Sequence, residues 1–242
     1  MHRFGLSRFL ALGAVVSATA FASAEVSLVL FDCRVESSLG SSSWQFIIAE
    51  PPKGDIEWVL DYPVQMIDPL NGNLIATMEG ASATYIADPQ INLNFLVTAG
   101  VVDTQFTITS ALLSFATIDP ADARASAAIT VTDNDGSGAV ISGAHPSGKI
   151  FRADYNGVVP GGGIDFANLV ASVIAAPFDT NDAFENVPFT PVGVPVSSMS
   201  TQLKFWLTAN DDANGTTNFE VIPEPATLSL LGLAVLGLIR RR

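Results

Sequence analysis

The sequence predicts an all-β body, an antiparallel β-sandwich with jelly-roll-like connections, between an N-terminal signal helix and a C-terminal transmembrane helix. Two observations lead to this fold. Apolar residues recur at every second position in several short segments, as they do in half-buried strands. Turn-forming residues separate these segments at short intervals, which is the pattern of a sandwich rather than of strands alternating with helices.

Four segments show the clearest alternation. In the first, Ile91, Leu93, Phe95 and Val97 share one face of a predicted strand. The same period of two recurs in three further segments, at residues 106–109, 127–132 and 203–208. Proline, glycine, aspartate and asparagine favour turns. Clusters of such residues lie between the segments, at 68–72, 88–89, 99–100, 119–120, 134–136 and 156–157.

The remainder of the body contains little that suggests a helix. A short helix is compatible with Phe166–Ile174 or with Pro120–Ala125. Long loops are expected at Gly157–Gly163 and Pro177–Pro195. No domain boundary is evident within the body. We therefore expect one domain over residues 25–220, between a signal peptide at 1–24 and a terminal segment at 221–242.

Composition and charge narrow the range of functions. Apolar residues make up 48% of the 242 residues and charged residues 14%, so the body can bury a substantial core. Residues 25–222 hold six basic and 23 acidic side chains, a net charge of −17. Phosphate backbones would be repelled by such a body, which argues against nucleic-acid binding. The single cysteine, Cys33, lies in an apolar run and is predicted to be a buried thiol, with pairing to another chain as the alternative.

Residues 1–24 have the three parts of a secretory signal peptide. Arg3 and Arg8 form the basic part, Phe9–Phe21 the apolar part, and Ala22-Ser23-Ala24 the small-residue cleavage site. We expect cleavage between Ala24 and Glu25. This segment has no twin-arginine pair, which favours export through the Sec translocon.

The last residues form a second three-part segment. Pro223-Glu224-Pro225 interrupts any helix, because proline lacks a backbone N–H and restricts the residue before it. The uncharged residues 226–239 follow, and as a helix they would span about 21 Å, less than the hydrocarbon core of about 30 Å. Arg240, Arg241 and Arg242 would stay on the cytoplasmic side. The segment therefore suits a temporary membrane stop better than a permanent anchor.

This order of Pro-Glu-Pro, apolar run and arginine cluster resembles the PEP-CTERM sorting signal. The resemblance implies recognition by an exosortase, a transpeptidase-like membrane enzyme that would cut near Pro223-Glu224-Pro225. It also implies a transient inner-membrane anchor, then transfer to the cell surface or release, in bacteria that make extracellular polysaccharide. Such tails are also named ice-binding-protein C-terminal domains, a name that describes neither the tail's physics nor the body. An ordinary tail anchor is the alternative.

The loop over residues 133–138 is the best local candidate for a ligand site. Asp133, Asp135 and Ser137 place oxygen-bearing side chains at alternate positions before a glycine, which suits calcium. A full EF-hand is excluded, because Ala144 stands at the twelfth place, where that loop needs a glutamate. The alternative is a hairpin turn, in which aspartate and glycine serve only the backbone geometry. Asp211-Asp212 with Asn214-Gly215 forms a similar but weaker candidate.

No catalytic residue and no organic cofactor are predicted. His145 is the only histidine that remains after signal cleavage, and it is expected to be solvated in a loop beside Pro146. The Gly-x-Ser-x-Gly elbow of serine hydrolases does not occur in the sequence. The 23 acidic residues of the body offer many carboxylate pairs, so a glycan-active enzyme stays open as a third hypothesis.

Trp206 is relevant to a second functional hypothesis, carbohydrate binding. It alternates out of phase with Leu203, Phe205 and Leu207, so it either faces outward or lies under a loop or on the second sheet. Exposed aromatic side chains on sandwiches can stack on sugar rings.

The leading prediction is a non-enzymatic surface or extracellular-matrix protein. The alternative is a carbohydrate-binding module, with or without the help of calcium.

Overall fold

The computed structural model describes residues 27–48, 54–159 and 161–224. Among these residues, no helix is long and apolar enough to cross a membrane. Several predicted features fall outside the described ranges: the signal peptide with Ala22, Ala24 and Glu25, then Pro225, the run 226–239, and Arg240, Arg241 and Arg242.

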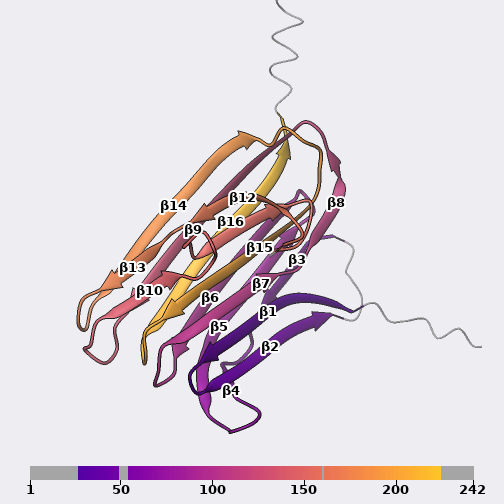
Figure 1. Ribbon diagram of the computed structural model, residues 1–242. Helices are drawn as coiled ribbons and strands as arrows, with labels where there is room; N and C mark the ends of the chain where they lie inside the picture. Colours follow the sequence, from indigo (N-terminus) through magenta and orange to yellow (C-terminus); the bar gives the residue numbers. More distant parts are fainter. Residues whose placement is uncertain (1–26, 49–53, 160, 225–242) are drawn as a thin grey trace, which may run out of the picture.

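Two sheets face each other across one apolar core (Figure 1). The larger sheet has nine strands: β1 (Leu28–Ser37), β2 (Gly40–Ile48), β7 (Thr104–Ser110), β8 (Leu113–Ile118), β10 (Ala139–Gly143), β11 (Phe151–Tyr155), β12 (Ile164–Leu169), β13 (Ser172–Ala175) and β15 (Val196–Leu207). The smaller sheet has seven: β3 (Ile56–Val59), β4 (Val64–Ile67), β5 (Leu74–Ile86), β6 (Gln90–Ala99), β9 (Ala121–Thr132), β14 (Thr180–Pro191) and β16 (Asp212–Pro223).

All strand pairings in the described residues are antiparallel. The main path of the larger sheet is β12-β11-β15-β7-β1-β2, and that of the smaller sheet is β14-β9-β16-β6-β5-β3. The chain moves repeatedly from one sheet to the other, for example at β2–β3, β6–β7, β8–β9 and β15–β16. The predicted antiparallel sandwich, with such crossing connections, is confirmed.

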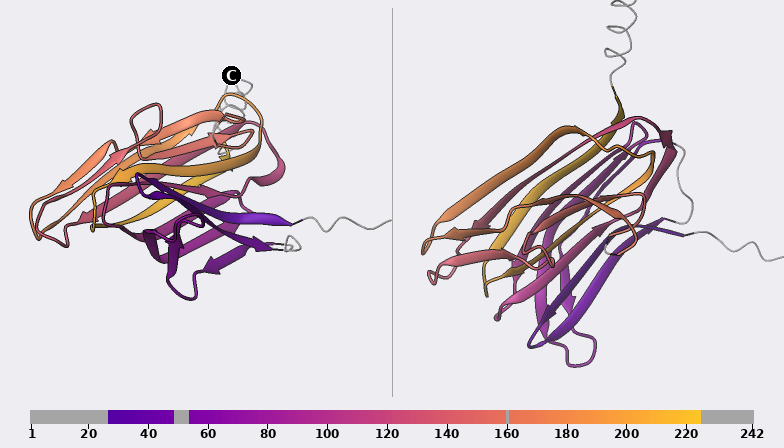
Figure 2. Two further views of the ribbon diagram at one scale, coloured as in Figure 1. Left: turned by 60° about the horizontal axis from the view of Figure 1, so that its bottom comes forward. Right: turned by 45° about the horizontal axis from the view of Figure 1, so that its top comes forward.

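The last two strands occupy the middle of the two sheets. β15 lies between β11 and β7, and β16 lies between β9 and β6. Figure 2 shows β16, in yellow, running along the sandwich to its end at the top of the right-hand view. Both sheets are therefore complete only when the C-terminal part of the body is in place.

Aromatic rings from both sheets meet in the core. Phe205 of β15 stacks on Phe95 of β6, with ring centroids 5.4 Å apart, and on Phe106 of β7 at 5.3 Å. Gly215 of β16 makes room for this stack, because a Cβ there would lie 2.6 Å from Phe95 Cε1. Cys33 is fully buried, as predicted, and burial raises the pKa of its thiol to about 12.

Tyr85 makes a polar link between the two sheets. Its side chain is buried on β5, and its hydroxyl donates a hydrogen bond to the carbonyl of Leu30 on β1. The same hydroxyl accepts a hydrogen bond of 2.9 Å from the backbone N–H of Ala111, which follows β7. The Ala111 N–H also donates a hydrogen bond of 3.1 Å to the Leu30 carbonyl. Burial raises the pKa of the phenol, so Tyr85 is a neutral donor at ordinary pH.

Three sequence predictions about the body are wrong. The two stretches expected as short helices are strands for the most part: Ala121–Ala125 begin β9, and Phe166–Ile174 covers the end of β12, a two-residue connection and the start of β13. The expected loop at Pro177–Pro195 contains the long strand β14. The partners of β9, β13 and β14 are distant in sequence, which local pattern does not reveal, whereas β12 pairs with β11, the strand before it.

Two prolines in β14 explain why that segment suggested a loop. Pro188 lies where the pairing with β9 shifts register, between Val187 and Thr190, and Pro191 is the last residue of the strand. Proline is tolerated at bulges and on edge strands, and β14 is the edge of the seven-stranded sheet. The loop expected at Gly157–Gly163 is confirmed for its described residues.

We expect Tyr85→Phe to lower the free energy of unfolding by about 1 kcal/mol, measured by urea denaturation. The loss stays moderate because the Ala111 N–H keeps the Leu30 carbonyl as a partner. Tyr62→Phe is the matched control, because Tyr62 is 80% exposed and its hydroxyl can bond to water. Equal effects of the two substitutions would show that the hydroxyl of Tyr85 does not link the sheets.

Candidate functional site

The predicted sorting segment begins inside the fold. Val221 is buried and pairs with Ala123, and Pro223 still pairs with Ala121 at the end of β16. The backbone N–H of Glu224 donates a hydrogen bond of 3.1 Å to the carbonyl of Pro120. The first residues of the segment 221–242 are therefore part of the central strand of the seven-stranded sheet, and the Pro-Glu-Pro motif begins at the last residue of that strand.

The carboxylate of Asp133 organises the loop between β9 and β10. Asp133 is buried, and its Oδ2 accepts the N–H of Gly136 at 2.8 Å while its Oδ1 accepts the N–H of Gly138 at 2.9 Å. Oδ2 also accepts the N–H of Phe178, in the turn between β13 and β14. One carboxylate thus holds its own loop and joins it to a second loop, as expected of an aspartate in a turn.

Asp211 joins Asp133 and Asp135 in one cluster. One carboxylate oxygen from each of the three residues lies within 4.8 Å of the others. Burial raises the pKa of Asp211, and the nearby Asp133 and Asp135 raise it further. Asp135 is exposed, and its pKa is lowered by hydrogen bonds from Ser137 and Asn210. Three carboxylates this close would be stabilised by a cation or by hydrogen-bond donors.

The structure places two of the predicted calcium ligands in one cluster with a third aspartate. It brings Asp133 and Asp135 together, and the third carboxylate of this cluster comes from Asp211. The backbone N–H of Ser137 instead donates 2.9 Å to Asp135 Oδ1, as in a simple turn. Asp211 also stabilises the loop backbone, because it accepts hydrogen bonds from the N–H of Asn134 and the hydroxyl of Thr208. The geometry accounts for these aspartates as turn-forming residues, and calcium binding stays a prediction.

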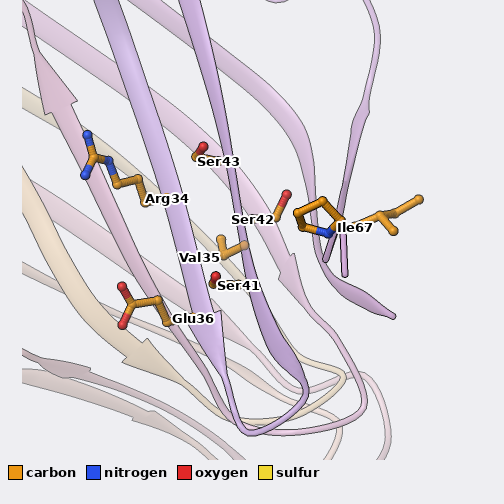
Figure 3. A pocket seen from close by; sticks show the side chains of 8 residues that line it. Arg34, Val35, Glu36, Ser41, Ser42, Ser43 and Ile67 are labelled. Carbon is orange, nitrogen blue, oxygen red and sulfur yellow. The ribbon is translucent and has the colours of Figure 1, made fainter. Parts of the chain in front are cut away.

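The outer face of the nine-stranded sheet carries charged side chains in pairs. Arg34 donates from Nε to Asp32 Oδ1 at 3.0 Å, and the amide of Gln45 also donates to Asp32. Figure 3 shows Arg34 and Glu36 on β1 beside the serines of β2, where a hollow of about 470 Å³ opens. A neighbouring groove of about 630 Å³ runs over β1, β7 and β15 and is lined by Asp32, Arg34, Glu36 and Lys204 among others.

Trp206 lies on this same outer face. Its side chain is 42% exposed, so the outward orientation is the one found of the two that the sequence left open. In the sheet it stands between Gln105 of β7 and Ser142 of β10. An aromatic ring is thus exposed among polar side chains on the larger sheet.

His145 is not the solvated loop residue that the sequence predicted. It is buried, and its Nε2 lies 3.3 Å from the carbonyl of Gln202 on β15. Burial lowers the pKa of the imidazole, and the positive charges of Arg152 and Lys204 lower it further. The ring is therefore neutral at pH 7. The loop folds back onto β15, because the Ala144 N–H bonds to the Lys204 carbonyl.

Two features of the candidate sites were missed. The sequence noted Asp211 as a separate turn, although it lies beside Asp133 because β16 pairs with β9. The aromatic residues of the segment expected as a loop, Phe184 and Phe189, stand exposed on the outer side of β14. The outward-facing Phe184 is apolar and the inward-phase Glu185 is charged, so the sequence shows no clean apolar–polar alternation that could have identified this strand.

Three solved structures show a distant likeness to this fold. A carbohydrate-binding module solved in complex with β-1,4-galactotriose is 12% identical, with a TM-score of 0.28, over 55% of this chain and 71% of that chain. An arabinose-bound α-L-arabinofuranosidase is 15% identical, with a TM-score of 0.25, over 58% and 22%. The Gt strain structure of infectious bursal disease virus is 11% identical, with a TM-score of 0.25, over 85% and 69%.

Sequence comparison adds one assignment. No curated protein matches the chain. The family description "PEP-CTERM protein-sorting motif" matches residues 221–242, the segment in which the sequence shows Pro-Glu-Pro, the apolar run and the arginine cluster. The chain therefore carries a PEP-CTERM protein-sorting motif over residues 221–242, as an exported protein with such a domain does.

Proposed function

We propose that this exported, exosortase-sorted protein serves a non-enzymatic structural or interaction role at the cell surface or in the extracellular polysaccharide matrix. The PEP-CTERM motif at residues 221–242 carries the proposal, because it implies export, a transient membrane anchor and exosortase processing. The Sec translocon would deliver the chain to the membrane. The sorting motif would then hold the folded sandwich on the outer side until it is cut.

The body suits a role outside the cell. Residues 25–222 carry a net charge of −17, which keeps copies of the chain apart and soluble. The fold has no disulfide to support it, because Cys33 is the single cysteine, and one continuous core spans both sheets. Hydrolysis of the host's own polysaccharide by the purified protein would overturn the non-enzymatic assignment.

Intact mass of the extracellular protein tests the sorting. In cells with exosortase, we expect the chain to start at Glu25 and to end after about Pro225. The new end should not precede Pro223, because Val221 and Pro223 are still paired to β9. In cells without exosortase, the tail should be retained with its arginines, in the inner membrane. A full-length C-terminus retained in the membrane of normal cells would contradict the proposal.

Carbohydrate binding is the second candidate function. It is favoured by exposed aromatic side chains on the outer faces of both sheets, Trp206 at 42% and Phe184 at 64% exposure. Aromatic faces pack well against flat apolar surfaces, such as one face of a sugar ring. A glycan array with the purified exported protein should then give reproducible binding. The absence of binding, both with and without calcium, would remove this candidate.

The calcium hypothesis has a thermal test. If Asp133, Asp135 and Asp211 hold the ion, millimolar calcium should raise the Tm at pH 7. The raised pKa of Asp211 adds a pH dependence, since protons compete for this carboxylate and the gain should shrink as the pH falls toward 4. Asp211→Asn should abolish the calcium effect, whereas Asp179→Asn, outside the cluster, should keep it. An unchanged Tm of the native protein would dismiss the site.

A further inference from the structure

We propose that the outer face of the seven-stranded sheet binds a neutral polysaccharide, with one sugar ring in a groove beside β14. The inference rests on the proposed extracellular role and adds a site and a ligand class to it. We call this hollow the edge groove. It has a volume of about 410 Å³ and is lined by side chains of β9, β14 and β16, among them Ser126, Phe184, Asn186, Phe189 and Asn218. β14 forms the outer border of the sheet in Figure 1.

Two phenylalanines border the edge groove. Phe184 is 64% exposed and Phe189 is 39% exposed, although both belong to a strand whose other face packs on the core. Phe184 pairs across the sheet with Ala128, whose small side chain leaves the ring uncovered. Exposed phenylalanine rings leave a large apolar area in water, and a flat apolar partner would remove that area. The C–H face of a pyranose ring is such a partner.

Uncharged polar groups form the floor between these rings. Asn186, Ser126 and Asn218 lie side by side on three adjacent strands. The amide of Asn218 donates to Asn92, which leaves its own carbonyl oxygen open. Neither the Asn186 side chain nor the Ser126 hydroxyl has a hydrogen-bond partner within the described ranges. Amide and hydroxyl groups with free donors and acceptors match the hydroxyl groups of a sugar.

Arg124 closes one end of the groove without adding net charge. Its Nε donates 2.7 Å to Glu220 Oε2, and its guanidinium carbon lies 4.8 Å from the centre of the Phe189 ring. The ion pair and the ring hold the guanidinium in place and neutralise it. The remaining N–H groups of Arg124 can still donate to a ligand oxygen.

The floor continues across the sheet as a row of uncharged side chains. Asn218 pairs with Asn92 of β6, and Asn92 pairs with Thr84 of β5. From Asn186 to Thr84 the row crosses five strands, which is about 19 Å at the usual spacing of neighbouring strands. No other described strand packs over this outer face. A polymer that enters the edge groove can therefore extend along the row, which favours a polysaccharide over a single sugar.

The negative charge of the body favours a neutral polymer as the ligand. A body with a net charge of −17 repels acidic polysaccharides, and the floor of the edge groove offers no unpaired cation to offset this. The same repulsion disfavours a second copy of the chain as the occupant. The groove on the nine-stranded sheet is a poorer site, since a ligand there would have to desolvate Asp32, Arg34, Glu36 and Lys204.

Affinity gel electrophoresis tests the proposal with the exported protein purified from cells. The gels contain dextran, mannan or a β-glucan as neutral probes, or alginate or hyaluronan as acidic ones. We expect at least one neutral probe to retard the native protein. Phe184→Ala should weaken that binding about ten-fold, and Asn186→Ala should weaken it as well. Ile174→Ala is the matched control, because Ile174 is 62% exposed on β13 of the opposite sheet, and this variant should bind like the native protein.

None of the three substitutions changes the net charge, so mobility in gels without polysaccharide should be equal. The Tm of each variant shows that folding is intact, and Asn186→Ala removes no described side-chain hydrogen bond. Loss of binding in Ile174→Ala to the same extent as in Phe184→Ala, or retardation by acidic probes alone, would overturn the proposal. Failure of every probe to bind would also overturn it, and so would dimerisation that Phe184→Ala abolishes. The intact-mass experiment would still decide the export and sorting independently.

Discussion

The position of β16 in the middle of the seven-stranded sheet is the constraint on which the rest of the structure depends. β16 pairs with β9 on one side and with β6 on the other, and β15 lies in the same way between β11 and β7. Without these two strands, each sheet would be split into halves with unpaired inner edges. The stack of Phe205 on Phe95, for which Gly215 makes room, depends on the same two strands.

This placement ties the fold to the sorting motif. The strand that completes the smaller sheet ends at Pro223, and the Pro-Glu-Pro motif begins at that residue. A cut after the motif leaves every strand intact, whereas a cut a few residues earlier would remove Val221 from the core. Removal of the residues after Pro225 therefore leaves every described strand intact. The apolar run 226–239 would be too short, as a helix, for a lasting anchor, which suits a segment that is removed. The two outer faces stay available for ligands.

Local pattern predicted the strands whose faces alternate clearly, and it failed where the pattern was ambiguous. Residues 91–97 and 127–132 form parts of β6 and β9 as expected. The residues around Ala121–Ala125 could suit a helix or a strand, and only the pairing with β14 and β16 decides between them. His145 was expected to be solvated because it stands in a loop beside Pro146, yet this loop folds back on β15. In the candidate calcium site, the sequence identified Asp133 and Asp135 but not their contact with Asp211.

The sequence by itself determined the fold class, the buried state of Cys33 and the sorting motif. Each of these depends on composition or on the order of residues along a short segment. The tertiary structure decided which turns meet and which aromatic rings remain in water. The tertiary structure also showed that the sorting motif begins within the last residues of a central strand. These features depend on hydrogen bonds between strands far apart in the chain, such as Asn186 beside Ser126 and Ser126 beside Asn218. No local periodicity encodes such a register, because the choice of partner is made by the packing of the whole core.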